Sequence, residues 1–311
     1  KPGAAPGEYT FELPNLDDTN YMRTPAVPAA DDYLTDRLTD KAIGFIDDAI
    51  NHHGSQPFHL TLAHYAVHTP IEAPGNASAP DGKGYEYFQA RKAARAAEFA
   101  AHPAGDALVT DYSSRIRITQ DNAVYAAMMK SYDASFGAIW SYLQATNDPR
   151  NPGKKLSETT IVVVSSDHGG KSTNPIDDNK FLEDDSTDSV NPAPVLEADN
   201  EYRSSYSNTY NSYPTSNYPY RFGKTWVFEG GLKVPLLIYI PGMTTGGTHS
   251  DAFVHHADLF ASFIDMAGGA QSANSTDSIS FMLPATQPQK TARDESFHFF
   301  TNASTGTGNP A

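Results

Sequence analysis

Apolar residues recur at helical spacing in two segments of the chain. Over residues 36–52 the recurring positions are Leu38, Ala42, Ile43, Ile46 and Ile50. Over residues 119–146 they are Val124, Met128, Tyr132, Phe136, Ile139 and Leu143. Both patterns predict an amphipathic helix whose apolar stripe packs against a core. Residues 86–101, which are rich in Ala and Arg, predict a third helix on the surface.

Three shorter runs predict strands. Residues 57–66 alternate between apolar and polar positions, whereas 160–166 and 236–240 are continuous apolar runs, typical of strands buried on both faces. With 311 residues, the chain is long enough for one large α/β domain or two small ones.

Two of these runs end at residues that can carry chemistry. The strand at 160–166 leads into Asp167-His168-Gly169-Gly170, and His68 follows the strand at 57–66. In an open α/β sheet, ligands bind beyond the carboxyl ends of the strands. A carboxylate and an imidazole there can bind a divalent cation, and glycine lets the backbone approach it closely. The alternative is an Asp that caps the next helix beside a surface His.

A third segment precedes the apolar run at 236–240. It contains Pro214-Thr215-Ser216-Asn217, then Arg221-Phe222-Gly223-Lys224, then Phe228-Glu229-Gly230-Gly231-Leu232-Lys233-Val234-Pro235. The three segments together resemble the formylglycine-dependent sulfatase family of the alkaline-phosphatase-like superfamily. The segments at 258–268 and 278–284 fit the same family, so the resemblance covers most of positions 30–300.

This resemblance implies a fold and a site. The implied fold is α/β: an alkaline-phosphatase-like mixed, mostly parallel sheet flanked by helices on both faces, truncated at the N-terminus and lacking most of the small C-terminal subdomain. Asp167 and His168 match ligands of one divalent cation, most often Ca²⁺. His68 matches the acid for the leaving group, and Lys224 matches the lysine that holds the sulfate. The alternatives are a core histidine and a surface lysine.

Three further residues are candidate substrate contacts. Lys171 and Arg221 lie close to the matched motifs, and His298 falls in a segment that loosely resembles a substrate-pocket element of some relatives. Residues 172–213, rich in Asn, Asp, Ser and Tyr, are interpreted as a long insertion at the rim of the site.

The family's nucleophile has no counterpart in this chain. There is no Cys and no Ser-x-Pro-x-Arg motif to supply the formylglycine. We therefore expect residues 1–300 to be part of one sulfatase-like catalytic domain, with 301–311 a flexible tail or linker. The missing N-terminal part of the same enzyme is its expected partner and would carry the formylglycine.

Charge narrows the choice of partners. The net charge of −15 disfavours binding to nucleic acid or to an anionic membrane. A protein that handles sulfated polymers then needs a local basic pocket, for which the candidates are Lys171, Arg221, Lys224 and Lys233. No run of ~18 apolar residues is present, so no membrane span is expected.

The resemblance implies a sulfuric ester hydrolase that removes sulfate from a sulfated polysaccharide or oligosaccharide. Its implied location is periplasmic or secreted. Two alternatives stay open: a phosphomonoesterase or phosphodiesterase of the same superfamily, and a degenerate carbohydrate-binding relative without catalysis.

Overall fold

The computed structural model describes residues 33–68, 71–76, 79–95, 108–111, 114–118, 120, 122–175, 195–196, 201–203, 215–269 and 277–282. Its helices are α1 (Leu34–His52), α2 (Tyr85–Ala94), α4 (Ala123–Ala145), α7 (Glu229–Leu232) and α8 (Asp258–Met266), with short 3₁₀ turns at Pro80–Gly82 and Leu156–Glu158. Its strands are β1 (Glu72–Pro74), β2 (Leu108–Asp111), β3 (Ser114–Arg117), β4 (Val162–Ser165), β5 (Thr173–Pro175), β6 (Val195–Leu196), β7 (Glu201–Arg203) and β8 (Leu236–Tyr239). No helix in these ranges is both long enough and apolar enough to cross a bilayer.

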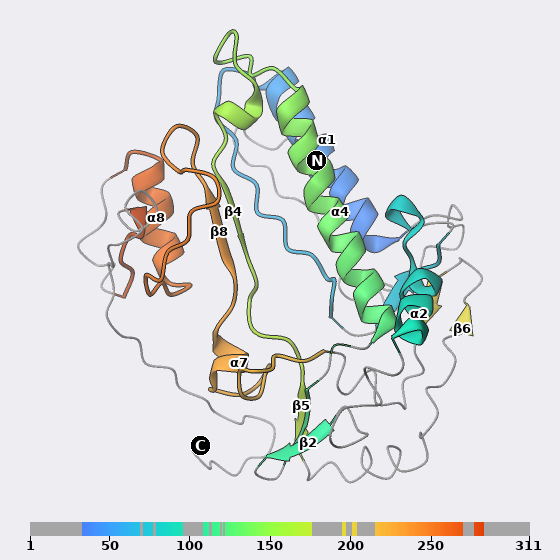
Figure 1. The fold of residues 1–311 in the computed structure, drawn as a ribbon. Helices are drawn as coiled ribbons and strands as arrows, with labels where there is room; N and C mark the ends of the chain where they lie inside the picture. Colours follow the sequence, from blue (N-terminus) through green and yellow to red (C-terminus); the bar gives the residue numbers. More distant parts are fainter. Residues whose placement is uncertain are drawn as a thin grey trace, which may run out of the picture.

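Helices α1 and α4 pack side by side (Figure 1), which confirms the two amphipathic helices predicted from periodicity. Where they meet, α4 presents small residues, and the hydroxyl groups of Thr39 and Ser135 lie 2.5 Å apart. The prediction that Phe136 belongs to the core stripe is wrong, because its side chain is 40% exposed. Ser131 and Ser135 are buried in its stead, since small side chains let two helices approach closely.

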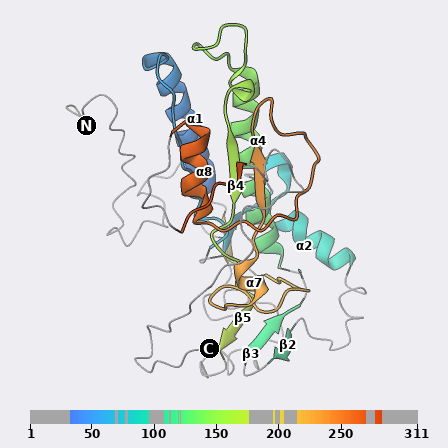
Figure 2. The same ribbon diagram turned by 90° about the vertical axis from the view of Figure 1, so that its left-hand side faces the viewer.

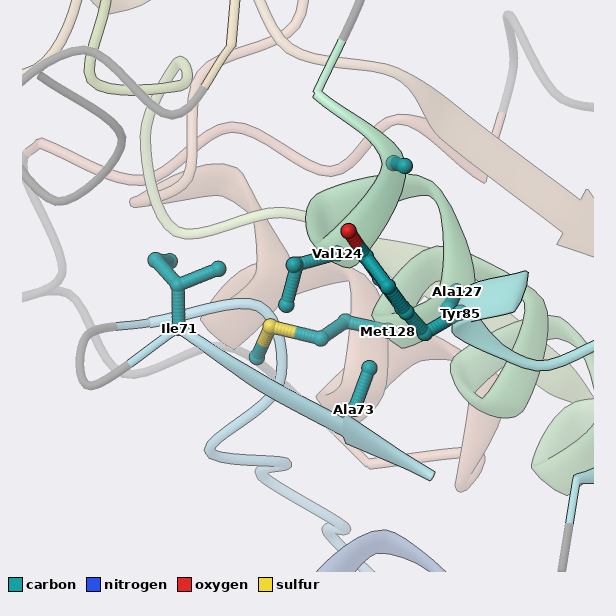
Figure 3. Close-up of a cluster of buried hydrophobic side chains, with 7 residues drawn as sticks. Ile71, Ala73, Tyr85, Val124, Ala127 and Met128 are labelled. Atoms are coloured by element: carbon teal, nitrogen blue, oxygen red, sulfur yellow. The ribbon is translucent and has the colours of Figure 1, made fainter. Parts of the chain in front are cut away.

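Two hydrophobic clusters hold the helices to the extended segments. In the first, Met128 of α4 reaches toward Ile71, beside β1 (Figure 3). The second joins α1, α4 and the turn after α4 through the buried residues Ile46, Ile50, Leu143 and Leu156. Val162 of β4 packs against this second cluster, so α1 and α4 cover one face of β4.

Among the described residues, every hydrogen-bonded pair of strands is antiparallel. β4 pairs with β8, β2–β3–β5 form one small sheet, and β1–β7–β6 form another. The protein is therefore a mixture of helices and strands, as expected, and its mostly parallel sheet stays a prediction.

The segment predicted as a strand at 57–66 is extended but joins no strand ladder among the described residues. Its side chains nevertheless alternate as in a strand. Phe58 and Leu60 pack against the cluster between α1 and α4, whereas the His59 ring contacts Phe263 of α8 with centroids 5.8 Å apart. The segment thus lies between helices on two sides, as a strand of a three-layer α/β domain does.

The carboxyl end of β4 meets a compact loop. Figures 1 and 2 both place α7 close to that end, with β5 beyond it. The expected insertion at 172–213 begins with β5 and also contains β6 and β7. The rest of that insertion and the tail at 301–311 fall outside the described residues.

Candidate active site

The Gly-Gly turn after β4 docks directly on the loop 215–233. The Gly169 amide donates to Gly231 O (2.9 Å), and the Lys224 amide donates to Gly170 O (3.0 Å). A Cβ on Gly169 would collide with the carbonyl group of Gly230. Two backbones touch here, which only glycine permits, and the contact fixes Lys224 against the turn that carries Asp167 and His168.

Asn217 locks this contact with its side chain. Its Oδ1 accepts from the Gly170 amide (3.2 Å), while its Nδ2 donates to Gly170 O (2.7 Å) and to Phe222 O (3.0 Å). On either side of Lys224, Phe222 has φ 58° and Thr225 has φ 77°. Left-handed backbone at such residues costs ~1–3 kcal/mol each and persists only where the surroundings hold it. The backbone around Lys224 is therefore held in one conformation.

His68 and Lys224 meet at this site although 156 residues separate them. The Lys224 ammonium group donates to His68 Nε2 across 2.8 Å. His68 is exposed and Lys224 is half-buried, so both side chains are accessible to a ligand. An imidazole can give or take a proton and an ammonium group can stabilise an oxyanion, which are the two demands of ester hydrolysis.

Asp167 and His168 are poised beside one another. The His168 Nδ1–H donates to Gly169 O (2.9 Å), which leaves His168 Nε2 facing Asp167 Oδ2 at 3.2 Å. Two acceptor atoms at that distance repel each other unless a proton or a cation lies near both. The Asp167 side chain is 82% exposed, so a divalent cation can reach it.

This pair fits part of a Ca²⁺ shell. Asp167 offers the oxygen donor that Ca²⁺ prefers, while an imidazole is a less usual ligand for that ion. In the part of the chain that the structure describes, no group of three or more His, Asp or Glu side chains converges as a metal shell. A six- to eight-coordinate ion would thus need further oxygen donors from elsewhere.

Comparisons with known proteins identify the family. The family model described as "Sulfatase" matches residues 5–270. The chain belongs to the sulfatase family. It is similar to a sulfatase of Formosa agariphila (24% identity over 237 residues, 76% of this chain and 30% of the relative). It is also similar to an uncharacterized sulfatase of Schizosaccharomyces pombe (25% identity over 248 residues, 71% of this chain and 41% of the relative).

Two solved structures are also similar. One is Ps i-CgsB, with 24% identity and a TM-score of 0.48 over 82% of this chain and 38% of that chain. The other comes from work on glycosaminoglycan metabolism by Bacteroides thetaiotaomicron, with 18% identity and a TM-score of 0.46 over 86% of this chain and 39% of that chain. The chain spans less than half the length of each of these relatives.

The remaining candidates of this sulfatase chain fall into three groups. The Arg221 guanidinium group lies over the rings of Phe222 and Phe228, 5.1 and 4.6 Å from their centroids, on the loop that carries Lys224. Lys171 is half-buried directly after the Gly-Gly turn. His298 lies outside the described residues. The substrate-contact roles of all three stay predictions.

Two residues that were not predicted as part of the site support its backbone through hydrogen bonds. His256, just before α8, donates from Nε2 to Ser166 O (2.9 Å), next to Asp167. Asn217 stands in a segment that was noted only for its resemblance. Both act by hydrogen bonding to backbone carbonyl groups, and a one-dimensional pattern gives no signal of such contacts.

His64 anchors the approach to His68. Burial lowers the pKa of the His64 imidazole, so its neutral form is favoured. Its Nε2 lies 2.9 Å from Ser135 Oγ, and its ring makes an edge-to-face contact with Tyr132 of α4. This attachment to α4 fixes the end of the extended segment four residues before His68.

Proposed function

We propose that this chain is part of an enzyme that hydrolyses sulfate esters of a sulfated carbohydrate. Membership of the sulfatase family supports the reaction class. The observation that carries the proposal is the contact between His68 and Lys224 beside the Asp167–His168 turn. An acid, a cationic side chain and a pair of candidate metal ligands that meet near the end of β4 can supply the proton transfer and the charge stabilisation that sulfate-ester cleavage requires.

The residues divide the work as follows. Lys224 holds the sulfuryl oxygens with the N–H groups that His68 does not use. The Nδ1–H group of His68 would donate the proton that the departing alcohol needs, while the Lys224 ammonium group, which donates to His68 Nε2, passes a proton to that nitrogen, so that the imidazole stays neutral. Asp167 and His168 would hold Ca²⁺, which when bound supplies positive charge opposite the developing negative charge of the sulfuryl group.

A further part of the same enzyme would complete the site. We infer that it supplies the formylglycine and an additional strand. β4 uses one edge for β8, and its other edge has no partner in the described ranges. The backbone of residues 57–64 likewise makes no hydrogen bond there. Because unpaired strand edges are avoided, a strand inserted between the two would satisfy both.

The substrate class and the location form part of the same proposal. A strongly acidic protein repels sulfated polymers, so the cluster of Arg221, Lys224 and Lys233 would provide the local attraction. Sulfated polysaccharides are extracellular, which favours a periplasmic or secreted enzyme.

The test compares two esters in the enzyme that contains this chain together with its nucleophile. We expect hydrolysis of 4-nitrophenyl sulfate to exceed that of 4-nitrophenyl phosphate at equal concentration and to depend on Ca²⁺. Faster phosphate release would establish the phosphoesterase alternative. Absence of turnover with both esters and with sulfated oligosaccharides would favour the binding relative.

A further inference from the structure

The loop that fixes Lys224 also presents exposed aromatic rings and cations. Tyr218 is 71% exposed and Tyr220 is 40% exposed. Between residues 215 and 233 there are three cationic side chains, Arg221, Lys224 and Lys233, and one acidic one, Glu229. The loop therefore carries 3 − 1 = +2 charges in a protein whose net charge is −15.

The cations lie against aromatic rings. The Lys233 ammonium group is 4.7 Å from the centroid of the Tyr220 ring, and the Arg221 guanidinium group is 4.6 Å from that of Phe228. Hydrogen bonding to Tyr220 raises the pKa of Lys233, which favours its charged form still further. Cation–π contacts of this kind hold a charge in place without neutralising it.

These side chains stand on a rigid base close to Lys224. The Gly230 amide donates to Arg221 O (2.9 Å), and a Cβ on Gly231 would collide with the backbone of Trp226. The amides of Tyr218 and Tyr220 are bonded to Ser216 Oγ (3.1 Å) and Asn217 O (2.9 Å). The backbone beneath these side chains is thus already ordered before a ligand binds.

We propose that Tyr218, Tyr220 and Lys233 form a subsite for a second sulfated sugar unit, next to the unit whose ester is cleaved at Lys224. The inference rests on the proposed function. Apolar C–H faces of a pyranose pack on an exposed phenol ring, and a sulfate group on that unit pairs with the Lys233 ammonium group. The enzyme accordingly recognises an oligosaccharide and not an isolated sulfated monosaccharide.

Binding is measured by isothermal titration calorimetry on the complete enzyme, made inactive by replacement of its nucleophile, with oligosaccharides of chondroitin sulfate, heparin and carrageenan and their desulfated counterparts. We expect at least one sulfated probe to bind, and Tyr218→Ala/Tyr220→Ala to weaken it about tenfold.

Two matched variants sharpen the result. Lys233→Ala is expected to remove most of the preference for the sulfated over the desulfated probe. Phe260→Ala, which removes a ring on α8 that is 58% exposed, is expected to leave affinity unchanged. Equal affinity in the wild type and the double Tyr variant, or no binding of any probe, would overturn the subsite.

Turnover separates this inference from the proposed function. In the enzyme with its nucleophile, the double Tyr variant is expected to hydrolyse 4-nitrophenyl sulfate at the wild-type rate, since that ester carries no sugar. A parallel loss with this ester would show that the rings position Lys224 and bind no sugar, which overturns the subsite. Tyr-dependent binding without any sulfate hydrolysis would refute the proposed function and leave the subsite standing.

Discussion

Asp148 follows helix α4 and Asp167 follows strand β4, yet their carboxylates differ in burial and in the number of their hydrogen bonds. The Asp148 side chain is fully buried and accepts hydrogen bonds from the Arg150 guanidinium group, the Arg150 amide and Asn151 Nδ2. Asp167 is 82% exposed and contacts residues adjacent in sequence, chiefly His168. The Asp148 carboxylate is hydrogen-bonded within its own loop, whereas the oxygen atoms of the Asp167 carboxylate are open to solvent.

The pKa of Asp148 reflects its partners. Burial by itself would raise the pKa of this carboxyl group, but the hydrogen bonds from Arg150 and Asn151 hold it well below its usual range. The charged form is thus stabilised within the fold. From this comparison we expect the exposed carboxylate of Asp167 to serve catalysis. The buried, hydrogen-bonded carboxylate of Asp148 is expected to stabilise the fold.

The largest expected effect is on catalysis at Asp167. Asp167→Ala should lower kcat roughly a hundredfold or more in the complete enzyme, a usual scale for loss of charge stabilisation. Its unfolding free energy should change by less than about 0.5 kcal/mol, as for most exposed sites. Steady-state kinetics and urea unfolding measure the two, with Asp251→Ala as the control because that carboxylate is also exposed (97%). A stable variant with normal kcat would contradict the account.

The reverse is expected at Asp148. Asp148→Ala leaves the partly buried Arg150 without its carboxylate, and the loss of stability should be about 3 kcal/mol. Turnover per folded molecule should stay within about twofold. Because the native pKa is depressed, the stabilisation is present above pH 3.8 and is lost as the pH falls below that value. Urea unfolding of both proteins between pH 3 and 7 checks the size and the direction.

Calcium provides the third contrast. At 100 times its Kd, Ca²⁺ should stabilise the complete enzyme by about 2.7 kcal/mol, and Asp148→Ala by the same amount. Asp167→Ala should show little of this gain, since the exposed carboxylate is the proposed ligand. Thermal unfolding with and without chelator measures the effect. Equal stabilisation of the Asp148→Ala and Asp167→Ala variants by Ca²⁺ would show that Asp167 is not a ligand of this ion.

The smallest effect is expected at a third carboxylate, Asp36 in the first turn of α1. Burial, with the nearby charge of Asp40, raises the pKa of Asp36 to about 6. The protonated form is therefore favoured by the fold, and its contribution is lost as the pH rises from 3.8 to 6. Asp36→Asn should stabilise the protein at pH 7 by less than about 1 kcal/mol after solvent screening.

The gain from Asp36→Asn should disappear below about pH 4, where Asp36 is protonated in both states. The favourable position of a carboxylate at a helix N-terminus opposes the gain. A variant that is less stable at pH 7 than the wild type would show that this helix-terminal effect exceeds the cost of burial.

Local patterns predicted the long helices better than the sheet. α1 and α4 follow from apolar spacing, because a helix makes its hydrogen bonds within one segment. The segment 57–66 alternates between apolar and polar residues as a strand does. A strand that pairs with it would come from a distant part of the chain, and a local periodicity cannot identify that part. Phe136 was wrongly assigned to the core because small residues, and not the largest apolar ones, form the face of α4 that contacts α1.

Two of the predicted site residues lie in contact in the structure, whereas the residues that support them were not predicted. His68 and Lys224 were placed by resemblance, and the structure brings their side chains together across 156 residues. Asn217 and His256 were given no role there because they bind backbone carbonyl groups. The proposed role of Tyr218 and Tyr220 depends on the solvent exposure of their rings, which the sequence alone does not reveal.

A double-mutant cycle on His68 and Lys224 tests the central claim most directly. In the complete enzyme, His68→Ala and Lys224→Ala should each lower kcat for a sulfate ester roughly a hundredfold or more. The double variant should be little slower than the slower single variant, because groups that act as one unit are not additive. Fully multiplicative losses, or near-normal rates in the single variants, would show that the two side chains touch without sharing a catalytic task.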